Sequence, residues 1–146
     1  MKKILFTLSL AFIAFIGFNN AIAQESGAKI EFKSDVVDYG TIDQHSDGLR
    51  EFVFTNTGDA PLIISNAKGS CGCTVPTWPK EPIAPGATAS IKVKYATNRV
   101  GAFNKTVTLT SNAVNEPTKV VRIKGNVLQK PAGGAPINNS GAPTAN

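Results

Sequence analysis

Two cysteines, Cys71 and Cys73, are the residues of this chain whose type and spacing could do chemistry. They flank Gly72 in the segment Gly-Ser-Cys-Gly-Cys-Thr, and the 146-residue chain has no other cysteine. Residues i and i+2 of a strand point the same way with their Cα atoms roughly 6.6 Å apart, which is near the upper limit for a disulfide. Gly72 lets the backbone bend inward, so we expect a disulfide here to close with strain.

Three chemistries remain open for this pair. A disulfide in so small a loop stabilises a fold by only about 1.6 kcal/mol, against ~3 kcal/mol for a 15-residue loop, and strain raises its reduction potential. Such a bond would suit a redox switch better than a staple. Two thiolates could instead hold Cu(I) or half of a zinc site. The third alternative is a pair of buried thiols that pack as small apolar residues.

Other arrangements of reactive side chains give no support for an enzyme. His45 is the one histidine, and its segment Asp43–Gly48 reads as a polar turn, because the spacing does not match an EF-hand calcium loop. There is no G-x-S-x-G elbow and no phosphate-binding loop. Carboxylate pairs exist but are scattered over loops, so they give no support for glycosidase chemistry. We therefore predict a non-enzymatic protein with no catalytic residue, no cofactor and no assigned metal site.

Basic side chains follow the polar faces of two predicted strands. Lys92 and Lys94 alternate with apolar residues in one strand, and Arg122 and Lys124 do so in another. If these strands pair, the four cations form a stripe that could bind an acidic polysaccharide, a lipid headgroup or a protein. The alternative is a solvated sheet face, on which lysines discourage edge-to-edge aggregation.

The surrounding sequence alternates with the period of strands rather than of helices. Alternating or compact apolar stretches occur at 30–32, 49–55, 62–64, 89–95, 105–110 and 120–124, and Gly, Asn, Asp and Pro clusters separate them. About seven short strands in one domain indicate an all-β, immunoglobulin-like β-sandwich. The expected core aromatics are Phe52, Phe54, Tyr95, Phe103 and Trp78. Trp78 could instead be an exposed partner-binding residue, because it lies in a loop between two prolines.

The two ends of the chain differ in composition from this middle part. Residues 1–23 read as a secretory signal peptide, with two lysines, an apolar run and an Ala-Ile-Ala cleavage pattern that makes Gln24 the first mature residue. The apolar run is shorter than the ~20 residues of a membrane span. Residues 24–27 form a short lead, 28–128 the sandwich, and 129–146 a Pro/Gly/Ala/Asn-rich tail that we expect to be disordered.

The expected location is outside the cytoplasm, in the periplasm or the extracellular space, without a transmembrane span after cleavage. Loss of Lys2 and Lys3 with the signal peptide reduces the net charge from +5 to +3. This modest charge, and the lack of aromatic residues interleaved with the cations, argue against nucleic-acid binding. The expected partner is a protein or an envelope polymer.

The Cys-Gly-Cys segment and its surroundings resemble the bacterial domain of unknown function 1573 (DUF1573) family from about Ile30 to Val127. The matching pieces are Asp38–Gly40, Phe54–Gly58, Pro61–Ile64, Cys71–Thr74, Pro76 with Trp78, Ile83–Gly86, Arg99–Phe103, Ser111-Asn112 and Gly125. The most specific of them is Cys-Gly-Cys-Thr followed by Pro-Gly. The resemblance implies an immunoglobulin-like sandwich, akin to major sperm protein and hydin-type domains, in an exported or envelope-associated protein. It implies no activity, because none is established for the family.

These observations leave two hypotheses about function. The first is an exported, non-enzymatic binding or structural module of the cell envelope. The second is a thiol-disulfide redox or soft-metal protein that uses Cys71 and Cys73. The second requires the cysteine pair to be accessible to solvent, because a buried thiol is inert.

Overall fold

The structure is a computed structural model that describes residues 26–131. The predicted signal peptide and residues 132–146 of the predicted tail lie outside the described residues. Residues 26–131 form eight strands: β1 (Ile30–Phe32), β2 (Val36–Asp43), β3 (Leu49–Asn56), β4 (Ile64–Gly69), β5 (Thr74–Thr77), β6 (Thr88–Tyr95), β7 (Gly101–Ser111) and β8 (Thr118–Leu128).

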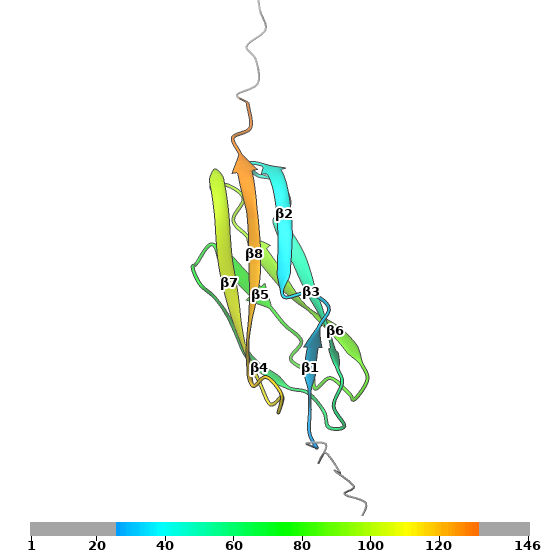
Figure 1. The fold of residues 1–146 in the computed structure, drawn as a ribbon. Coiled ribbons are helices and arrows are strands. Elements are labelled where there is room, and N and C mark those ends of the chain that lie inside the picture. The colour runs from blue at the N-terminus through cyan, green and yellow to red at the C-terminus, as the bar shows by residue number, and fades with distance from the viewer. Residues whose placement is uncertain (1–25, 132–146) are drawn as a thin grey trace, which may run out of the picture.

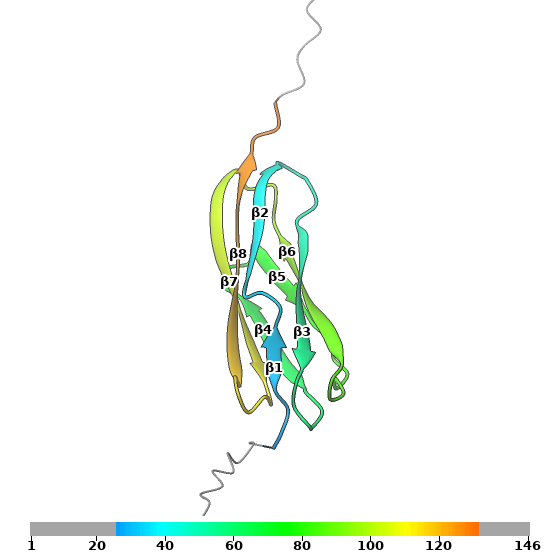
Figure 2. The same cartoon turned by 45° about the vertical axis from the view of Figure 1, so that its right-hand side comes forward.

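The strands form two four-stranded sheets, which lie face to face in Figures 1 and 2. The first sheet has the order β1-β3-β6-β5 and the second the order β2-β8-β7-β4. All neighbours are antiparallel except β2 and β8, which run parallel. The prediction of an all-β sandwich is confirmed, with eight strands in place of about seven. Within residues 26–131, no helix is long and apolar enough to cross a membrane.

The core lies between the sheets and is built by the alternation read from the sequence. In β6, Ile91 and Val93 are fully buried while Lys92 and Lys94 are exposed. Phe52 and Phe54 of β3 share the inner face in the same way. β-Branched and aromatic side chains suit this pleated, half-buried surface, so local preference and burial agree along most of the chain.

Tyr39 is a core residue that the sequence pattern did not indicate. It lies in β2, is 6% exposed, and packs edge-on against Phe103 with ring centroids 5.2 Å apart. Its hydroxyl donates to the carbonyl oxygens of Gly48 at 2.9 Å and Val93 at 3.3 Å. The register of β2 against β8 is interrupted between Asp38 and Thr41, which breaks the alternation by which a strand is recognised.

Asparagine side chains satisfy the backbone where strands end. Asn56, at the end of β3, is fully buried. Its amide nitrogen donates to the carbonyl oxygens of Ala60 (2.8 Å) and Ile83 (2.9 Å). Its amide oxygen accepts from the backbone N–H groups of Gly58 (3.0 Å) and Lys29 (3.3 Å). One side chain therefore holds three chain segments together at this end of the sandwich.

Replacement of Asn56 by alanine is expected to lower the free energy of unfolding by about 2–4 kcal/mol, because four backbone groups lose their partner in a buried place. Urea denaturation measures this loss. Asn66→Ala is the matched control, since Asn66 is exposed, and we expect its effect to stay within about 0.5 kcal/mol. Equal effects of the two substitutions would contradict the role given to Asn56.

Tyr39 should make stability depend on alkaline pH. Burial raises the pKa of Tyr39 from 10.0 to about 12. The positive charge of Arg50 opposes this shift, and the negative charge of Asp47 adds to it. A raised pKa in the folded state favours the neutral phenol, so this contribution is complete below pH 10 and is lost as the pH rises through 12. The difference in unfolding free energy between wild type and Tyr39→Phe, measured from pH 8 to 12, should be constant below pH 10 and change above it. A difference that stays constant to pH 12 would show that the phenol titrates normally.

Candidate functional site

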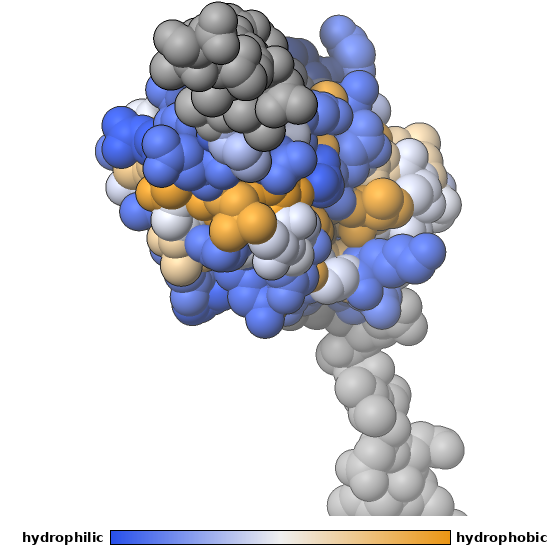
Figure 3. Space-filling view, turned by 90° about the horizontal axis from the view of Figure 1, so that it is seen from above, coloured by the Kyte–Doolittle hydropathy of each residue, from blue (hydrophilic) through white to orange (hydrophobic). Residues whose placement is uncertain are grey.

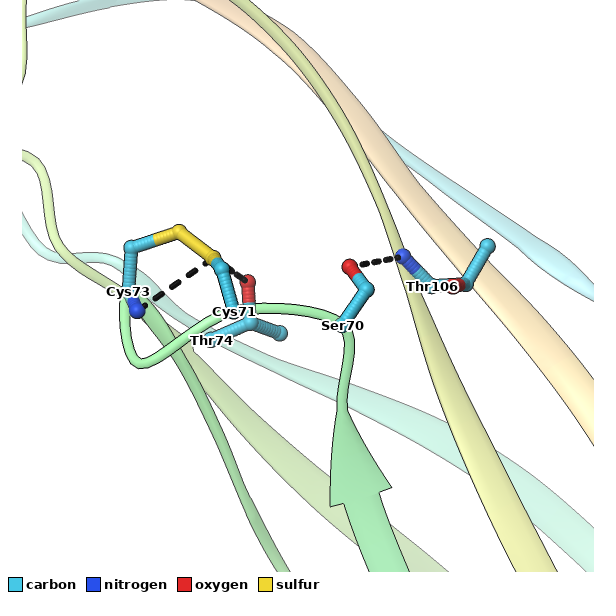
Figure 4. Close-up of a disulfide and its surroundings, with 5 residues drawn as sticks. All are labelled: Ser70, Cys71, Cys73, Thr74 and Thr106. Carbon is cyan, nitrogen blue, oxygen red and sulfur yellow. Dashed lines mark hydrogen bonds between the residues drawn. A yellow bond between two sulfur atoms is a disulfide. The ribbon is translucent and has the colours of Figure 1, made fainter.

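The Cys-Gly-Cys segment forms the turn by which the chain passes from the second sheet to the first. Before the turn, the N–H of Ser70 donates to the Thr106 carbonyl at 2.8 Å, and the Thr106 N–H donates to the Ser70 hydroxyl at 3.1 Å. After the cysteines, the N–H of Ala96 donates to the Cys73 carbonyl at 2.9 Å. Figure 4 shows the bond between Ser70 and Thr106 of β7. The turn is thus anchored to β7 of one sheet and to the residue that follows β6 in the other.

Cys71 and Cys73 are joined by a disulfide within this turn. Their Cα atoms are 5.2 Å apart, inside the usual range for a disulfide and shorter than the separation expected in an extended strand. The reason is that residues 70–73 are a turn rather than a strand, in which the Thr74 N–H donates to the Cys71 carbonyl at 3.1 Å. Gly69 is required just before the turn, because a Cβ there would overlap the Thr74 carbonyl oxygen.

The two sulfurs lie in different surroundings. Cys73 is only 4% exposed and belongs to the hydrophobic core, whereas Cys71 is half-buried at its margin. Cys71 Sγ accepts from the Cys73 N–H at 3.3 Å. The buried Thr74 places its Oγ1 3.6 Å from Cys71 Sγ and 3.8 Å from Cys73 Sγ. Cys71 is therefore the more exposed of the two cysteines, and one hydroxyl faces both sulfurs.

Thr74 and Ser70 are site residues that our sequence reasoning did not single out. The only signal in the sequence was their adjacency to the cysteines, because their contacts depend on how the turn folds. As for metal binding, no group of three or more His, Cys, Asp or Glu side chains is placed to hold an ion within residues 26–131. Any soft metal here would thus have two thiolates from this chain after reduction of the disulfide.

Trp78 lies just after β5 and is half-buried against the core. Its indole N–H donates to the Ile64 carbonyl at 3.0 Å, which ties the end of β5 to the start of β4. The ammonium of Lys80 lies 3.1 Å from the centre of a Trp78 ring, so a charged side chain covers part of the indole. These contacts favour the packing interpretation of Trp78, and its role in partner binding stays a prediction.

The basic stripe that would follow from pairing of the two cationic strands is not formed. Lys92 and Lys94 lie in β6 of the first sheet, and Arg122 and Lys124 lie in β8 of the second. Each pair alternates with buried residues, so the two pairs point outward from opposite faces of the sandwich. The period-two pattern gives the face of a residue within its own sheet but not the sheet to which the strand belongs, so it could not show that the two strands do not pair. A role of the four cations in partner binding stays a prediction.

Three of these four cations have polar partners on their own faces. Lys92 Nζ is 3.7 Å from Glu51 Oε1, and Lys124 Nζ is 3.3 Å from Asp38 Oδ2. Arg122 donates to Asn104 Oδ1 at 3.2 Å. Hydrogen bonds from the Gly40 N–H and then from Lys124 lower the pKa of Asp38. The two exposed ion pairs, at Lys92 and Lys124, contribute little stability and reduce the local positive charge.

The model of the DUF1573 family, described as a protein of unknown function, matches residues 30–127, which include the cysteine turn and all eight strands except the last residue of β8. The chain belongs to the DUF1573 family. No curated protein matches the sequence of this DUF1573 chain.

Solved structures similar to the DUF1573 chain share its fold at low identity. A protein of unknown function from Porphyromonas gingivalis W83 has a TM-score of 0.61 at 14% identity, covering 73% of this chain and 51% of that protein. The seventh PapD-like (ASH) domain of human CEP192 has a TM-score of 0.56 at 10% identity, covering 70% and 87% of the two chains. The VesB protease of Vibrio cholerae reaches 0.54 at 15% identity, covering 67% and 32%.

These likenesses confirm the predicted immunoglobulin-like fold, and at such identities they show the fold alone. The DUF1573 chain spans about half of the length of the Porphyromonas protein. The protease likeness covers only 32% of VesB. No activity follows from it for this chain.

The structure predicts the redox state of the mature protein. Protein isolated from its own cells and trapped with a thiol-alkylating reagent should have an intact mass two hydrogens below that of the dithiol, with no alkyl group added. Prior reduction under denaturing conditions should give two alkyl groups. Two alkyl groups without prior reduction would show that the disulfide does not form in the cell.

Proposed function

We propose that this protein is an exported, non-enzymatic binding module of the cell envelope. The observation that carries the proposal is a pair of exposed apolar side chains, Leu49 and Val75, which flank Lys94 on the outer face of the first sheet, at an end of the sandwich where Val100 and Leu128 are exposed as well. Leu49 opens β3, Val75 lies near the start of β5, Val100 precedes β7 and Leu128 ends β8; they are 41%, 56%, 52% and 47% exposed. Figure 3 views this end and shows apolar surface between polar side chains. Exposed apolar patches with a polar rim are typical of interaction surfaces.

The chemistry of this end favours a protein partner. In the first sheet, Lys94 pairs with Leu49 on one side and with Val75 on the other, and all three side chains are exposed. A cation between two apolar side chains suits a partner segment that presents apolar residues beside a carboxylate. Export is supported by the signal-peptide sequence at residues 1–23. The mass spectrum described above tests it, since the mature chain should begin at Gln24.

Thiol-disulfide exchange is the second candidate function. Of the pair that we expected to be accessible, Cys73 is 4% exposed, so the support for exchange comes from the half-buried Cys71 alone. Exchange needs only one sulfur open to an attacking thiolate. Exchange uses the cysteine turn and binding uses the apolar end, so one protein could perform both functions. Substitution of both cysteines by serine separates the two functions, since it removes exchange and leaves the apolar end unchanged.

A photoreactive amino acid at position 75, introduced into the protein in its own cell, should give one discrete cross-linked product. Position 120 is the matched control, because Val120 is also a valine on a strand, is 50% exposed, and lies near the start of β8 rather than at its end. The product at position 75 should fall several-fold with Lys94→Glu, which reverses the charge between the two apolar side chains. It should persist in the double cysteine-to-serine variant.

Equal products from positions 75 and 120 would overturn the proposed surface, and so would a product at 75 that Lys94→Glu leaves unchanged. Loss of the product in the double serine variant would instead favour exchange at the disulfide as the basis of binding. Circular dichroism of each variant shows that the sandwich is retained.

A further inference from the structure

We propose that the disulfide is attacked at one of its two sulfurs: a partner thiolate attacks Cys71, and Cys73 leaves as a thiolate to which the Thr74 hydroxyl donates a hydrogen bond. This inference deepens the second candidate function and rests on it. The substrate class that it names is a protein or peptide dithiol. Its basis is the geometry of three neighbouring side chains rather than the cysteine spacing alone.

The first step of the argument is access. Attack on a disulfide requires the incoming thiolate to approach the sulfur along the S–S axis, from the side opposite the leaving sulfur. Cys71 is half-buried at the margin of the core, and Gly72 beside it is exposed, with no atom within 4 Å of where its Cβ would be. Cys73 is 4% exposed within the core. Cys71 is therefore the more accessible of the two cysteines, and we expect the attack there.

The second step is the fate of the leaving sulfur. Burial penalises a charged thiolate, so Cys73 would be a poor leaving group in a wholly apolar place. Thr74 Oγ1 lies 3.8 Å from Cys73 Sγ, and Thr74 itself is 2% exposed, so water does not compete freely for its proton. As negative charge develops on Cys73, this hydroxyl can turn to donate a charge-assisted hydrogen bond.

The same hydroxyl also serves the other sulfur. Thr74 Oγ1 is 3.6 Å from Cys71 Sγ, which in addition accepts from the Cys73 N–H at 3.3 Å. After exchange, Cys71 is thus held by two donors when it in turn becomes the leaving thiolate. Thr74 is a positioning donor that faces whichever sulfur carries the charge.

The chemistry balances in two exchanges. In the first, the partner thiolate forms a bond to Cys71 Sγ while the Cys71–Cys73 bond breaks and its electron pair stays on Cys73. In the second, another thiolate of the same partner attacks the partner's own sulfur, and Cys71 leaves with the electron pair. The partner dithiol loses two electrons and two protons and becomes a disulfide, and this chain gains them as two thiols.

Single-cysteine variants test the order of attack. Cys73→Ser leaves Cys71 alone, and Cys71→Ser leaves Cys73 alone. With dithionitrobenzoate as the probe, the Cys71 thiol should react at least about tenfold faster than the Cys73 thiol in the folded protein. In guanidinium the two rates should converge, which shows that the fold causes the difference. Equal rates in the folded state, or a faster Cys73, would overturn the inference.

Thr74→Val in the chain with both cysteines tests the role of the hydroxyl. Reduction by dithiothreitol, followed by mass after alkylation, should slow about tenfold, the loss expected for a hydrogen bond to a charged group. Thr74→Ser should restore the rate. Thr106→Val is the matched control, since Thr106 contacts Ser70 through its backbone, and it should not slow reduction. If Thr74→Val and Thr106→Val behave alike, the role of Thr74 is wrong.

An experiment with a reduced peptide dithiol tests the order of attack separately from the exchange function on which it rests. Wild-type protein should oxidise the peptide stoichiometrically. If it does not, while Cys71 still reacts faster than Cys73 with the probe, exchange as a function fails and the order of attack stands. If the peptide is oxidised, but a version of it with a single thiol forms its mixed disulfide with Cys73 of the wild-type protein and releases Cys71, the function stands and the order of attack is overturned.

Discussion

The constraint on which this fold depends is that backbone groups must stay hydrogen-bonded wherever the chain leaves one sheet for the other. The chain changes sheet after β1, β2, β3, β4 and β6. At each change a ladder ends, and the freed N–H and C=O groups need other partners near the core. Asn56 supplies them after β3 and Ser70 after β4. Asn115 bonds both the N–H and the carbonyl of Ile30, so that the open edge of β1 is closed as well.

The inner faces of the strands could be predicted from sequence, because buried apolar side chains alternate with exposed polar ones along a strand. This is why Phe52, Phe54, Ile91, Val107 and Ile123 lie in the core as their patterns indicate. β2 and β5 could not be found in the same way. β2 carries a register shift within the run that includes Gly40, and β5 is four residues long with a proline. Short or interrupted strands offer too few repeats for the period to show.

Which strands become neighbours could not be read from the sequence, because it depends on contacts between distant segments. β6 and β8 have the same alternation of cations and apolar residues, yet they belong to opposite sheets. The disulfide shows the same limit on a smaller scale. Spacing made it feasible, but the turn brings the Cα atoms to 5.2 Å, and the crossover buries one sulfur more than the other.

Stability and chemistry are separable at the Cys-Gly-Cys turn. A disulfide around so few residues removes little entropy from the unfolded chain. The turn is meanwhile held at both ends without it, by Ser70 with Thr106 and by Cys73 with Ala96. Gly69 fits only because it has no side chain against the Thr74 carbonyl, and that contact is also independent of the sulfurs. Breaking the S–S bond therefore leaves the crossover anchored, so the proposed exchange of the two cysteines does not require the sandwich to unfold.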